Sequence, residues 1–208
     1  MPPPFDAVLC DIDGVIRFYD SDVLAGLEER AGLPPGTTER IGFAPQHAER
    51  LVLGRMTREE WARAIVAALV PDVPLAEARA LARALTHAEA RVDGAVVTLL
   101  RRARERCPVV LVSNATPWLD DDLALLGLHD LADGVVNSSL VGVAKPDARI
   151  YEIAAERAGV PVDRCLFVDD REENVAAAAA LGMTAVLHRS APGLERALAP
   201  LLGSAPLA

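Results

Sequence analysis

Short, mostly apolar runs recur along this chain and are separated by stretches with helical periodicity. The runs lack the polar alternation of half-buried strands, which is typical of strands buried inside a parallel sheet. They lie at Ala7–Cys10, 108–112, 134–137, Cys165–Val168 and Thr184–Leu187, with helices expected at 94–105, 117–126, 147–158, 172–181 and 192–202. Strands that alternate with helices across short loops predict an α/β fold with a doubly wound, Rossmann-like parallel sheet.

The pattern differs between residues 19 and 90, where helices are expected and no convincing strand is found. Residues 23–31 read as a helix that ends at Gly32, and further helices are expected at 46–53 and 75–91. The segment Thr57-Arg58-Glu59-Glu60 has the form of a capping box that opens a helix over 58–69. We therefore predict a small all-helical cap, residues 19–90, inserted into a catalytic core made of residues 1–18 and 91–208.

The composition of the chain argues against several classes of protein. Hydrophobic residues make up 51% of the chain and aromatic residues only 4%, so Ala, Leu and Val must build the core. A net charge of −9 without any basic run argues against a nucleic-acid partner. We expect no membrane span or signal peptide and a cytoplasmic location, because no long apolar run exists and Met1-Pro2-Pro3-Pro4 carries no basic residue. The three scattered cysteines suggest reduced, buried side chains.

The first apolar run ends abruptly in two carboxylates and a glycine, Asp11-Ile12-Asp13-Gly14. Ionised carboxylates buried within a strand would cost several kcal/mol, so they must lie beyond its carboxyl end, where ligands bind in open α/β sheets. Gly14 permits a tight turn and lets main-chain N–H groups approach an anion. An ordinary strand followed by an Asp-Gly turn explains this segment equally well when it is taken alone.

Lys145 is the only lysine among the 21 basic residues of the chain. Because arginine fills every other basic position, the lone lysine suggests a site that needs a compact ammonium instead of a forked guanidinium. Chance retention on a solvated surface is the alternative.

Polar residues also follow the other strands that we expect at the centre of the sheet. Ser113 and Asn114 follow one strand, and Asp169 and Asp170 follow another. In a doubly wound sheet these strand ends meet beside the first strand. Carboxylates without His or Cys make an all-oxygen site that suits Mg²⁺, and four clustered acids could not stay ionised without a cation. Ser113, Lys145 and main-chain N–H groups near Asp13 and Asn114 are donors for an oxyanion such as phosphate.

The motifs Asp11-Ile12-Asp13-Gly14-Val15, Ser113-Asn114, Lys145-Pro146-Asp147 and Asp169-Asp170 together resemble those of the haloacid dehalogenase superfamily, in the branch with a helical cap. The resemblance covers essentially the whole chain. The cap segment at 53–57, with Glu60 and Trp61 after it, is also similar to small phosphatases related to the amino-terminal domain of soluble epoxide hydrolase and to sugar-phosphate phosphatases.

The resemblance implies a role for each motif residue. Asp11 would attack phosphorus, and Asp13 would protonate the leaving oxygen and then activate water. Ser113 and Lys145 would hold the phosphoryl oxygens. Mg²⁺ would be bound by Asp11, the main-chain carbonyl of Asp13 and Asp170, with Asp169 either a direct or water-mediated ligand or a structural acid.

The function implied by the resemblance is a Mg²⁺-dependent phosphatase acting on a small organic phosphate monoester, with a sugar phosphate among the candidates. Dehalogenases of the superfamily lack an acid two residues after the first Asp, so Asp13 favours phosphoryl chemistry. Phosphonate hydrolysis by a cap lysine is excluded because the cap contains no lysine. A phosphomutase is an open alternative. So is a catalytically idle scaffold, although no catalytic group is missing.

The expected partner is a small-molecule substrate, and the oligomeric state is left open. The candidates for reading the substrate each have a structural alternative, and they are Arg17, Phe18, Tyr19, His47, Arg50 and Arg55. We expect Trp61 to belong to the core of the cap.

Overall fold

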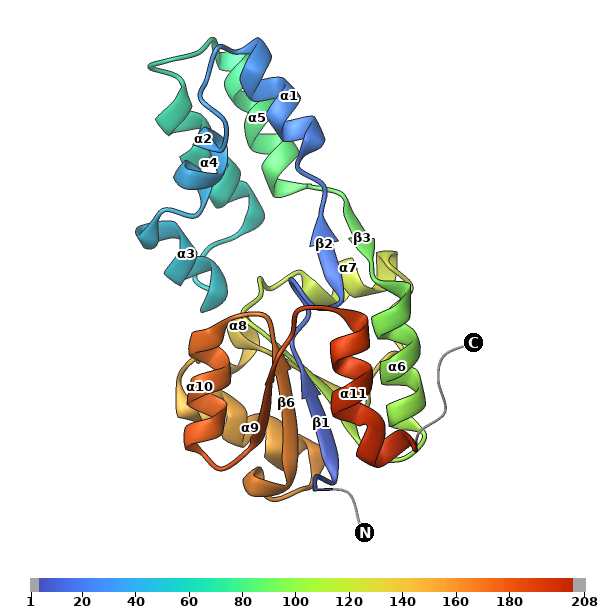
Figure 1. Ribbon diagram of the computed structural model, residues 1–208. Helices are drawn as coiled ribbons and strands as arrows, with labels where there is room; N and C mark the ends of the chain where they lie inside the picture. The colour runs from blue at the N-terminus through green and yellow to red at the C-terminus, as the bar shows by residue number, and fades with distance from the viewer. Residues whose placement is uncertain (1–3, 204–208) are drawn as a thin grey trace.

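The computed structural model describes residues 4–203 of the chain (Figure 1). Residues 1–3, on which part of the expectation about a signal peptide rests, lie outside the described residues, as do 204–208. The core is one five-stranded parallel sheet in the order β5-β4-β1-β6-β7. Its strands are β1 (Ala7–Cys10), β4 (Val109–Ser113), β5 (Gly134–Asn137), β6 (Cys165–Asp169) and β7 (Thr184–Leu187). This arrangement confirms the predicted α/β fold.

The central strand β1 lies between β4 and β6, and all four of its residues are fully buried. Cys10 at its carboxyl end is in register with Leu111 of β4 and with Val168 of β6. The polar residues that follow these three strands are therefore brought to one edge of the sheet. The chain order reverses on the two sides of β1, which makes this edge the usual ligand site of the fold.

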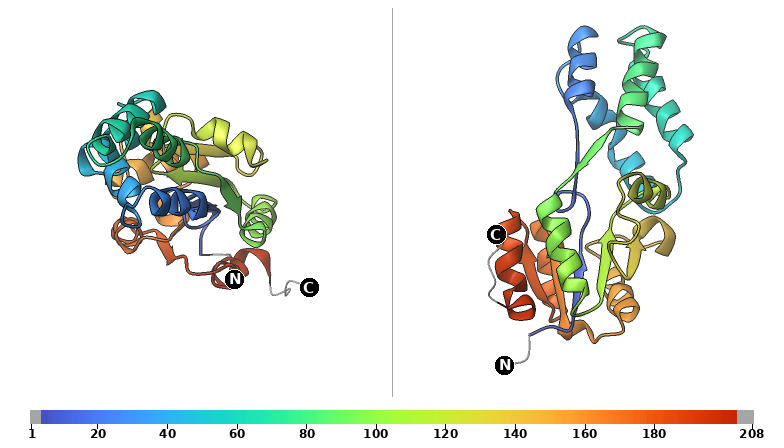
Figure 2. Two further views of the ribbon diagram at one scale, coloured as in Figure 1. Left: turned by 90° about the horizontal axis from the view of Figure 1, so that it is seen from above. Right: turned by 90° about the vertical axis from the view of Figure 1, so that its right-hand side faces the viewer.

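Helices cover both faces of the sheet (Figures 1 and 2). Side chains of β1 that alternate along the strand point to opposite faces. Val8 and Cys10 belong to the core cluster that contains residues of α6 (Gly94–Arg104) and α11 (Ala191–Leu202). Ala7 and Leu9 belong to the cluster that contains residues of α9 (Ala148–Ala158) and α10 (Glu172–Ala180). Three shorter elements complete the core: α7 (Leu119–Leu125), α8 (Ser138–Val141) and the 3-10 helix η1 (Val162–Arg164).

Five helices form a separate bundle above the sheet edge, which we call the cap (Figure 1). They are α1 (Asp22–Arg30), α2 (Thr37–Gly42), α3 (Pro45–Val52), α4 (Arg58–Leu69) and α5 (Leu75–Thr86). The capping box at the start of α4 is formed in both directions, since Thr57 and Glu60 bond each other's main-chain N–H. Trp61, Ile65 and Leu81 are buried in the core of the cap. The short helix α2 is an element that the sequence pattern did not predict.

Two short strands join the cap to the core, β2 (Arg17–Tyr19) and β3 (Ala90–Val92). They pair antiparallel, with Phe18 opposite Arg91, and they span the boundaries predicted at residues 18 and 90 (Figure 2). Neither strand was predicted, because three residues are too few to display a periodicity of two. Within residues 4–203, no helix combines the length and the apolar character needed to cross a bilayer.

Candidate active site

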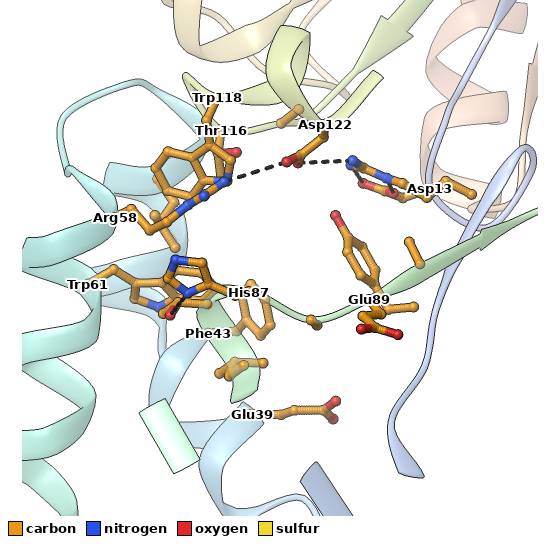
Figure 3. A pocket seen from close by; sticks show the side chains of 18 of the residues that line it. Asp13, Glu39, Phe43, Arg58, Trp61, His87, Glu89, Thr116, Trp118 and Asp122 are labelled. Carbon is orange, nitrogen blue, oxygen red and sulfur yellow. Dashed lines mark hydrogen bonds and ion pairs between the residues drawn. The ribbon is translucent and has the colours of Figure 1, made fainter. Parts of the chain in front are cut away.

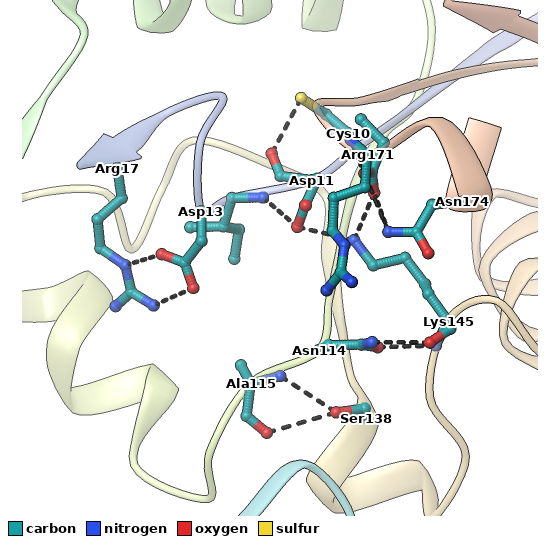
Figure 4. Close-up of polar contacts among 12 residues, drawn as sticks. Cys10, Asp11, Asp13, Arg17, Asn114, Ala115, Ser138, Lys145, Arg171 and Asn174 are labelled. Carbon is teal, nitrogen blue, oxygen red and sulfur yellow. Dashed lines mark hydrogen bonds and ion pairs between the residues drawn. The ribbon is translucent and has the colours of Figure 1, made fainter. Parts of the chain in front are cut away.

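Lys145 lies at the centre of the polar cluster at the carboxyl edge of the sheet (Figure 4). Its Nζ is 2.8 Å from Oδ1 of Asp11, and it donates a hydrogen bond of 2.7 Å to Oδ2 of Asp169. The residue is only 5% exposed, so the alternative of a solvated surface lysine is wrong. A compact ammonium can reach two buried carboxylates from one position.

The charges in this cluster do not balance. Burial raises the pKa of Asp11 to about 7 against the opposing effect of Lys145, and the negative charge of Asp169 raises it further. Burial alone would lower the pKa of Lys145, but Asp11 and Asp169 outweigh burial and raise it. One ammonium thus faces two carboxylates in a poorly solvated site, and a further cation would stabilise both.

Asp169 is fully engaged by protein donors. Besides Lys145, the Arg171 N–H donates to Oδ1 at 2.9 Å, and Nδ2 of Asn174 lies 3.0 and 3.1 Å from the two carboxylate oxygens. Asn174 is buried in the first turn of α10, and sequence reasoning missed it. The feature of the sequence that could have indicated Asn174 is its amide side chain at the start of an alanine-rich helix. Asp169 therefore holds Lys145 in place and is itself held by α10.

Asp170 lies against Gly14. A Cβ built on Gly14 would be only 2.3 Å from Oδ2 of Asp170, and Gly14 has a φ of +83°, so a side chain is excluded twice over. The Gly14 N–H donates to the carbonyl of Arg17, which means that this N–H is not free for the anion contact predicted from sequence. Asp11, Asp169 and Asp170 each offer an oxygen within 4.8 Å of the others, an arrangement that could hold a metal ion.

Asp13 points away from this acidic cluster and toward Arg17 (Figure 4). Arg17 donates two hydrogen bonds to Asp13, at 2.6 and 3.0 Å, and a third to Asp122 of α7 at 3.1 Å. Arg58 of the cap reaches the other oxygen of Asp122 at 3.5 Å (Figure 3). Arg17, a candidate for reading the substrate, is also the partner of Asp13. Asp122 was missed, because nothing in its sequence neighbourhood distinguishes it from Asp120 and Asp121.

Ser113 and Asn114 are adjacent in sequence but have different surroundings in the site. Ser113 is the buried last residue of β4. The Asn114 side chain bonds the main chain of Lys145 on both sides, accepting from its N–H at 2.7 Å and donating to its carbonyl at 2.8 Å. The Asn114 amide therefore fixes the loop that carries Lys145. The phosphate contact predicted for Asn114 stays a prediction, and it would use the main-chain N–H or the second hydrogen of Nδ2.

A cavity of about 740 Å³ lies between this edge of the sheet and the cap (Figure 3). Asp13 and Arg17 line it from the core, and Phe43, Arg58 and Trp61 line it from the cap. Polar contacts join the cap to the core beside the cavity: Ser138 Oγ donates to the carbonyl of Val52 at 2.6 Å, and Arg58 faces Asp122.

The residues that we considered for reading the substrate are only partly at this cavity. Arg17 and Tyr19 line it, whereas Phe18, His47, Arg50 and Arg55 are not among its lining residues. His47 contacts the carbonyl of Ile41, and Phe18 lies under the guanidinium of Arg91. Trp61 belongs to the cap core, as expected, and one part of it also faces the cavity.

Comparison with known proteins gives matches over most of the chain. The model of the haloacid dehalogenase-like hydrolases matches residues 5–182. Phosphoglycolate phosphatase from Xanthomonas campestris is 30% identical over 188 residues, which cover 86% of this chain and 81% of that protein. Phosphatase MT3486 from Mycobacterium tuberculosis is 46% identical over 65 residues, and this match spans 31% of the chain and only 30% of the relative's length.

Among solved structures, a HAD family enzyme from Bacteroides thetaiotaomicron superposes with a TM-score of 0.69. It is 20% identical, and the match covers 89% of this chain and 94% of that chain. That enzyme was crystallised in complex with magnesium and inorganic phosphate. At this identity the likeness establishes a shared fold.

Proposed function

Because the chain belongs to the haloacid dehalogenase-like hydrolase family, we propose that this enzyme is a Mg²⁺-dependent phosphatase that hydrolyses a small organic phosphate monoester through an aspartyl-phosphate intermediate. One observation carries the proposal: Asp11 lies beside Lys145 in the acidic cluster, whereas Asp13, two residues later, lines the cavity. A nucleophile and an acid that protonates the leaving group need this division of positions.

Asp11 is the nucleophile. Lys145 and the Ile12 N–H both lie on its Oδ1, at 2.8 and 2.6 Å, so Oδ2 is the oxygen that attacks phosphorus. The bond from phosphorus to the leaving oxygen breaks. For this step one oxygen of Asp13 must first exchange its bond from Arg17 for a proton, which it then gives to the leaving oxygen, while the other oxygen keeps its bond from Arg17. Asp13 then takes a proton from the water that attacks the aspartyl-phosphate, which releases inorganic phosphate and restores Asp11. Lys145 and Ser113 hold the phosphoryl oxygens.

The donor set around Asp11 fits Mg²⁺. Its side chains offer only carboxylate oxygens, and the one ammonium does not balance their charge. Since both oxygens of Asp169 already accept hydrogen bonds, we propose Asp11, Asp170 and the Asp13 carbonyl as the groups that hold the ion, with Asp169 positioning Lys145. The Bacteroides enzyme with bound magnesium and phosphate supports this choice of ion. When bound, Mg²⁺ neutralises charge on the phosphoryl oxygens.

The test is release of p-nitrophenol from its phosphate ester with Mg²⁺ and with excess EDTA. We expect turnover only with Mg²⁺ and a loss of turnover in Asp11→Asn. Binding of the metal can be followed without activity, because a ligand that binds only the folded state raises its melting temperature. We expect Mg²⁺ to stabilise the wild type and not Asp170→Asn, while Asp169→Asn keeps much of the stabilisation. Turnover that persists in EDTA, or in Asp11→Asn, would contradict the proposal.

A further inference from the structure

We propose that the alcohol released by this enzyme is apolar. The inference rests on the proposed phosphatase function and names the class of its substrate as monophosphate esters of apolar alcohols. Neither phosphoglycolate nor a sugar phosphate, the substrate class considered from sequence, belongs to that class.

The cavity lies on the side where the leaving group must be. Asp13, which protonates the leaving oxygen, lines the cavity, while Asp11 and Lys145 do not. The organic part of the ester is bonded to that oxygen and therefore extends from Asp13 toward the cap. A volume of about 740 Å³ is far larger than a two-carbon acid needs and lies within the range of typical ligand pockets.

Aromatic side chains are concentrated around this cavity (Figure 3). The chain contains only eight aromatic residues, and four of them line it: Tyr19, Phe43, Trp61 and Trp118. Trp61 of the cap stacks on Trp118 of the core with ring centroids 6.3 Å apart, and Phe43 lies 5.3 Å from Trp61. In a chain so poor in aromatic residues, half of them at one cavity indicate a surface built for apolar contact.

Part of this apolar surface is uncovered. Phe43 is 53% exposed and Tyr19 is 51% exposed, although both are large apolar or amphipathic side chains. Exposed apolar area that lines a concave site is area that a ligand can remove from water, at about 25 cal/mol per Å². An apolar leaving group would gain this stabilisation, and a hydroxylated sugar would not.

Acidic side chains outnumber arginines among the described residues that line the cavity. Its two arginines are already paired, Arg17 with Asp13 and Asp122, and Arg58 with Asp122 and the ring of Trp118. The lining residues also include three exposed acids, Glu39 in the cap, and Asp20 and Glu89 next to the strands β2 and β3. Nε of Arg58 is buried without a hydrogen-bond partner in the described part of the chain, so a carboxylate or second phosphate on the substrate would be repelled by these acids wherever it lies away from Arg58.

The experiment compares primary alkyl phosphates, because their leaving oxygens have similar basicity and only their apolar length differs. We would measure kcat/KM of the Mg²⁺-loaded enzyme for ethyl, butyl, hexyl and octyl phosphate, with glucose 6-phosphate and phosphoglycolate alongside. Burial of each CH₂ in an apolar site should raise kcat/KM by about threefold to fourfold until the cavity is filled. We expect octyl phosphate to be the best substrate and phosphoglycolate the poorest.

The variant Phe43→Ala tests whether this cavity is responsible. Its exposed position makes unfolding improbable as an explanation, and circular dichroism checks the fold. We expect a smaller dependence of kcat/KM on chain length in Phe43→Ala than in the wild type. Leu75→Ala is the matched control, since Leu75 is a 46% exposed cap residue that does not line the cavity.

Each outcome separates the two proposals. If all alkyl phosphates react at similar rates, or if glucose 6-phosphate or phosphoglycolate is preferred, the inference about the alcohol is wrong and the phosphatase function stands. If the dependence on chain length is as large in Phe43→Ala as in the wild type, the cavity is not its source and the inference also fails. If neither p-nitrophenyl phosphate nor any alkyl phosphate is hydrolysed, the phosphatase function itself is wrong.

Discussion

Both carboxylate oxygens of Asp13 accept hydrogen bonds from the guanidinium of Arg17, at 2.6 and 3.0 Å. Arg17 is 3% exposed, and its remaining ion pair, to Asp122, is 3.1 Å long. Burial disfavours the charge of Arg17, but the hydrogen bonds that it donates to Asp13 and the negative charge of Asp13 outweigh burial and raise the pKa of Arg17, so Arg17 stays a cation. Arg17 therefore orients Asp13 as a carboxylate and is itself held by α7, and Asp13 acts as the acid of the proposed mechanism only after one of these oxygens has taken up a proton.

Arg17→Lys should test this positioning role. Lysine keeps the charge but cannot form two parallel bonds to one carboxylate. We expect kcat/KM for hexyl phosphate to fall by about 10- to 100-fold. The fall should be much smaller for p-nitrophenyl phosphate, whose leaving group needs little protonation.

The matched control for Arg17→Lys is Arg50→Lys, at an exposed cap position away from the cavity. A purely structural role for Arg17 would reduce the rates of both esters equally. That result would contradict the assignment of Arg17 as the residue that positions Asp13.

Replacing the cation of the Lys145 cluster should destabilise the protein, whereas replacing one of its carboxylates should not. Lys145→Met leaves Asp11 and Asp169 buried without their cation, and removing one partner of a buried ion pair typically costs about 3–5 kcal/mol. Asp11→Asn instead leaves one ammonium with one carboxylate. We expect its free energy of unfolding to stay within about 1 kcal/mol of the wild type, because burial already disfavours the Asp11 charge.

Urea unfolding of both variants in Mg²⁺-free buffer measures these differences. Both variants should lack phosphatase activity, so the contrast lies in stability alone. Equal destabilisation by Lys145→Met and Asp11→Asn would show that the cluster does not carry excess negative charge.

Gly14→Ala should affect Asp170 directly. Alanine at this φ of +83° is strained, and its Cβ would collide with the carboxylate of Asp170. Strain of this kind costs about 1–3 kcal/mol, and displacement of Asp170 should also weaken Mg²⁺ binding. The measurements are urea unfolding and the Mg²⁺ concentration at half-maximal activity. Gly142→Ala is the control, because it has a similar φ of +74° with no atom within 4 Å of the added Cβ.

Asp133 links stability to pH at a distance from the site. Burial raises its pKa, but the Val109 N–H at 2.9 Å and Arg104 at 2.8 Å outweigh burial and lower its pKa below the ordinary 3.8. Between the two pKa values the unfolded chain binds more protons than the folded protein. The contribution of Asp133 to stability is therefore present above pH 3.8 and is lost as pH falls through the lowered pKa.

We expect Asp133→Asn to reduce the free energy of unfolding at pH 6 by less than about 1 kcal/mol, because the pair is partly exposed. The reduction should shrink at pH 3. Urea unfolding at both pH values measures it, with Asp121→Asn at an exposed position of α7 as the control. A difference that grows as pH falls would have the wrong sign.

The parallel sheet and its polar edge could be predicted from the sequence because both depend on local signals. Apolar runs mark the strands, and residues directly after them, such as Asp11 and Asp170, must lie at strand ends. Lys145 could be singled out because the chain otherwise uses arginine. The family and its hydrolase class followed from these motifs, and the comparison confirmed both.

Contacts between distant segments could not be found in the same way. Arg17 and Asp122 are 105 positions apart, and no periodicity relates them. Trp118 precedes α7 in the core but stacks on a cap residue, so its place at the cavity depends on how the cap sits on the sheet. The three-residue strands β2 and β3 exist only because each supplies the other's hydrogen bonds.

The pairing of β2 with β3 has a consequence for how such a protein can change over evolution. The chain leaves the core at Arg17 and returns at Val92 directly opposite, so the whole cap is bounded by two ends that already touch. A different bundle could be exchanged at this junction without moving Asp11, Lys145 or the sheet. The residues that carry the chemistry and the residues of the cap that select the substrate can therefore change separately in evolution. Trp118 belongs to the core side and would stay behind as the surface that any replacement must fit.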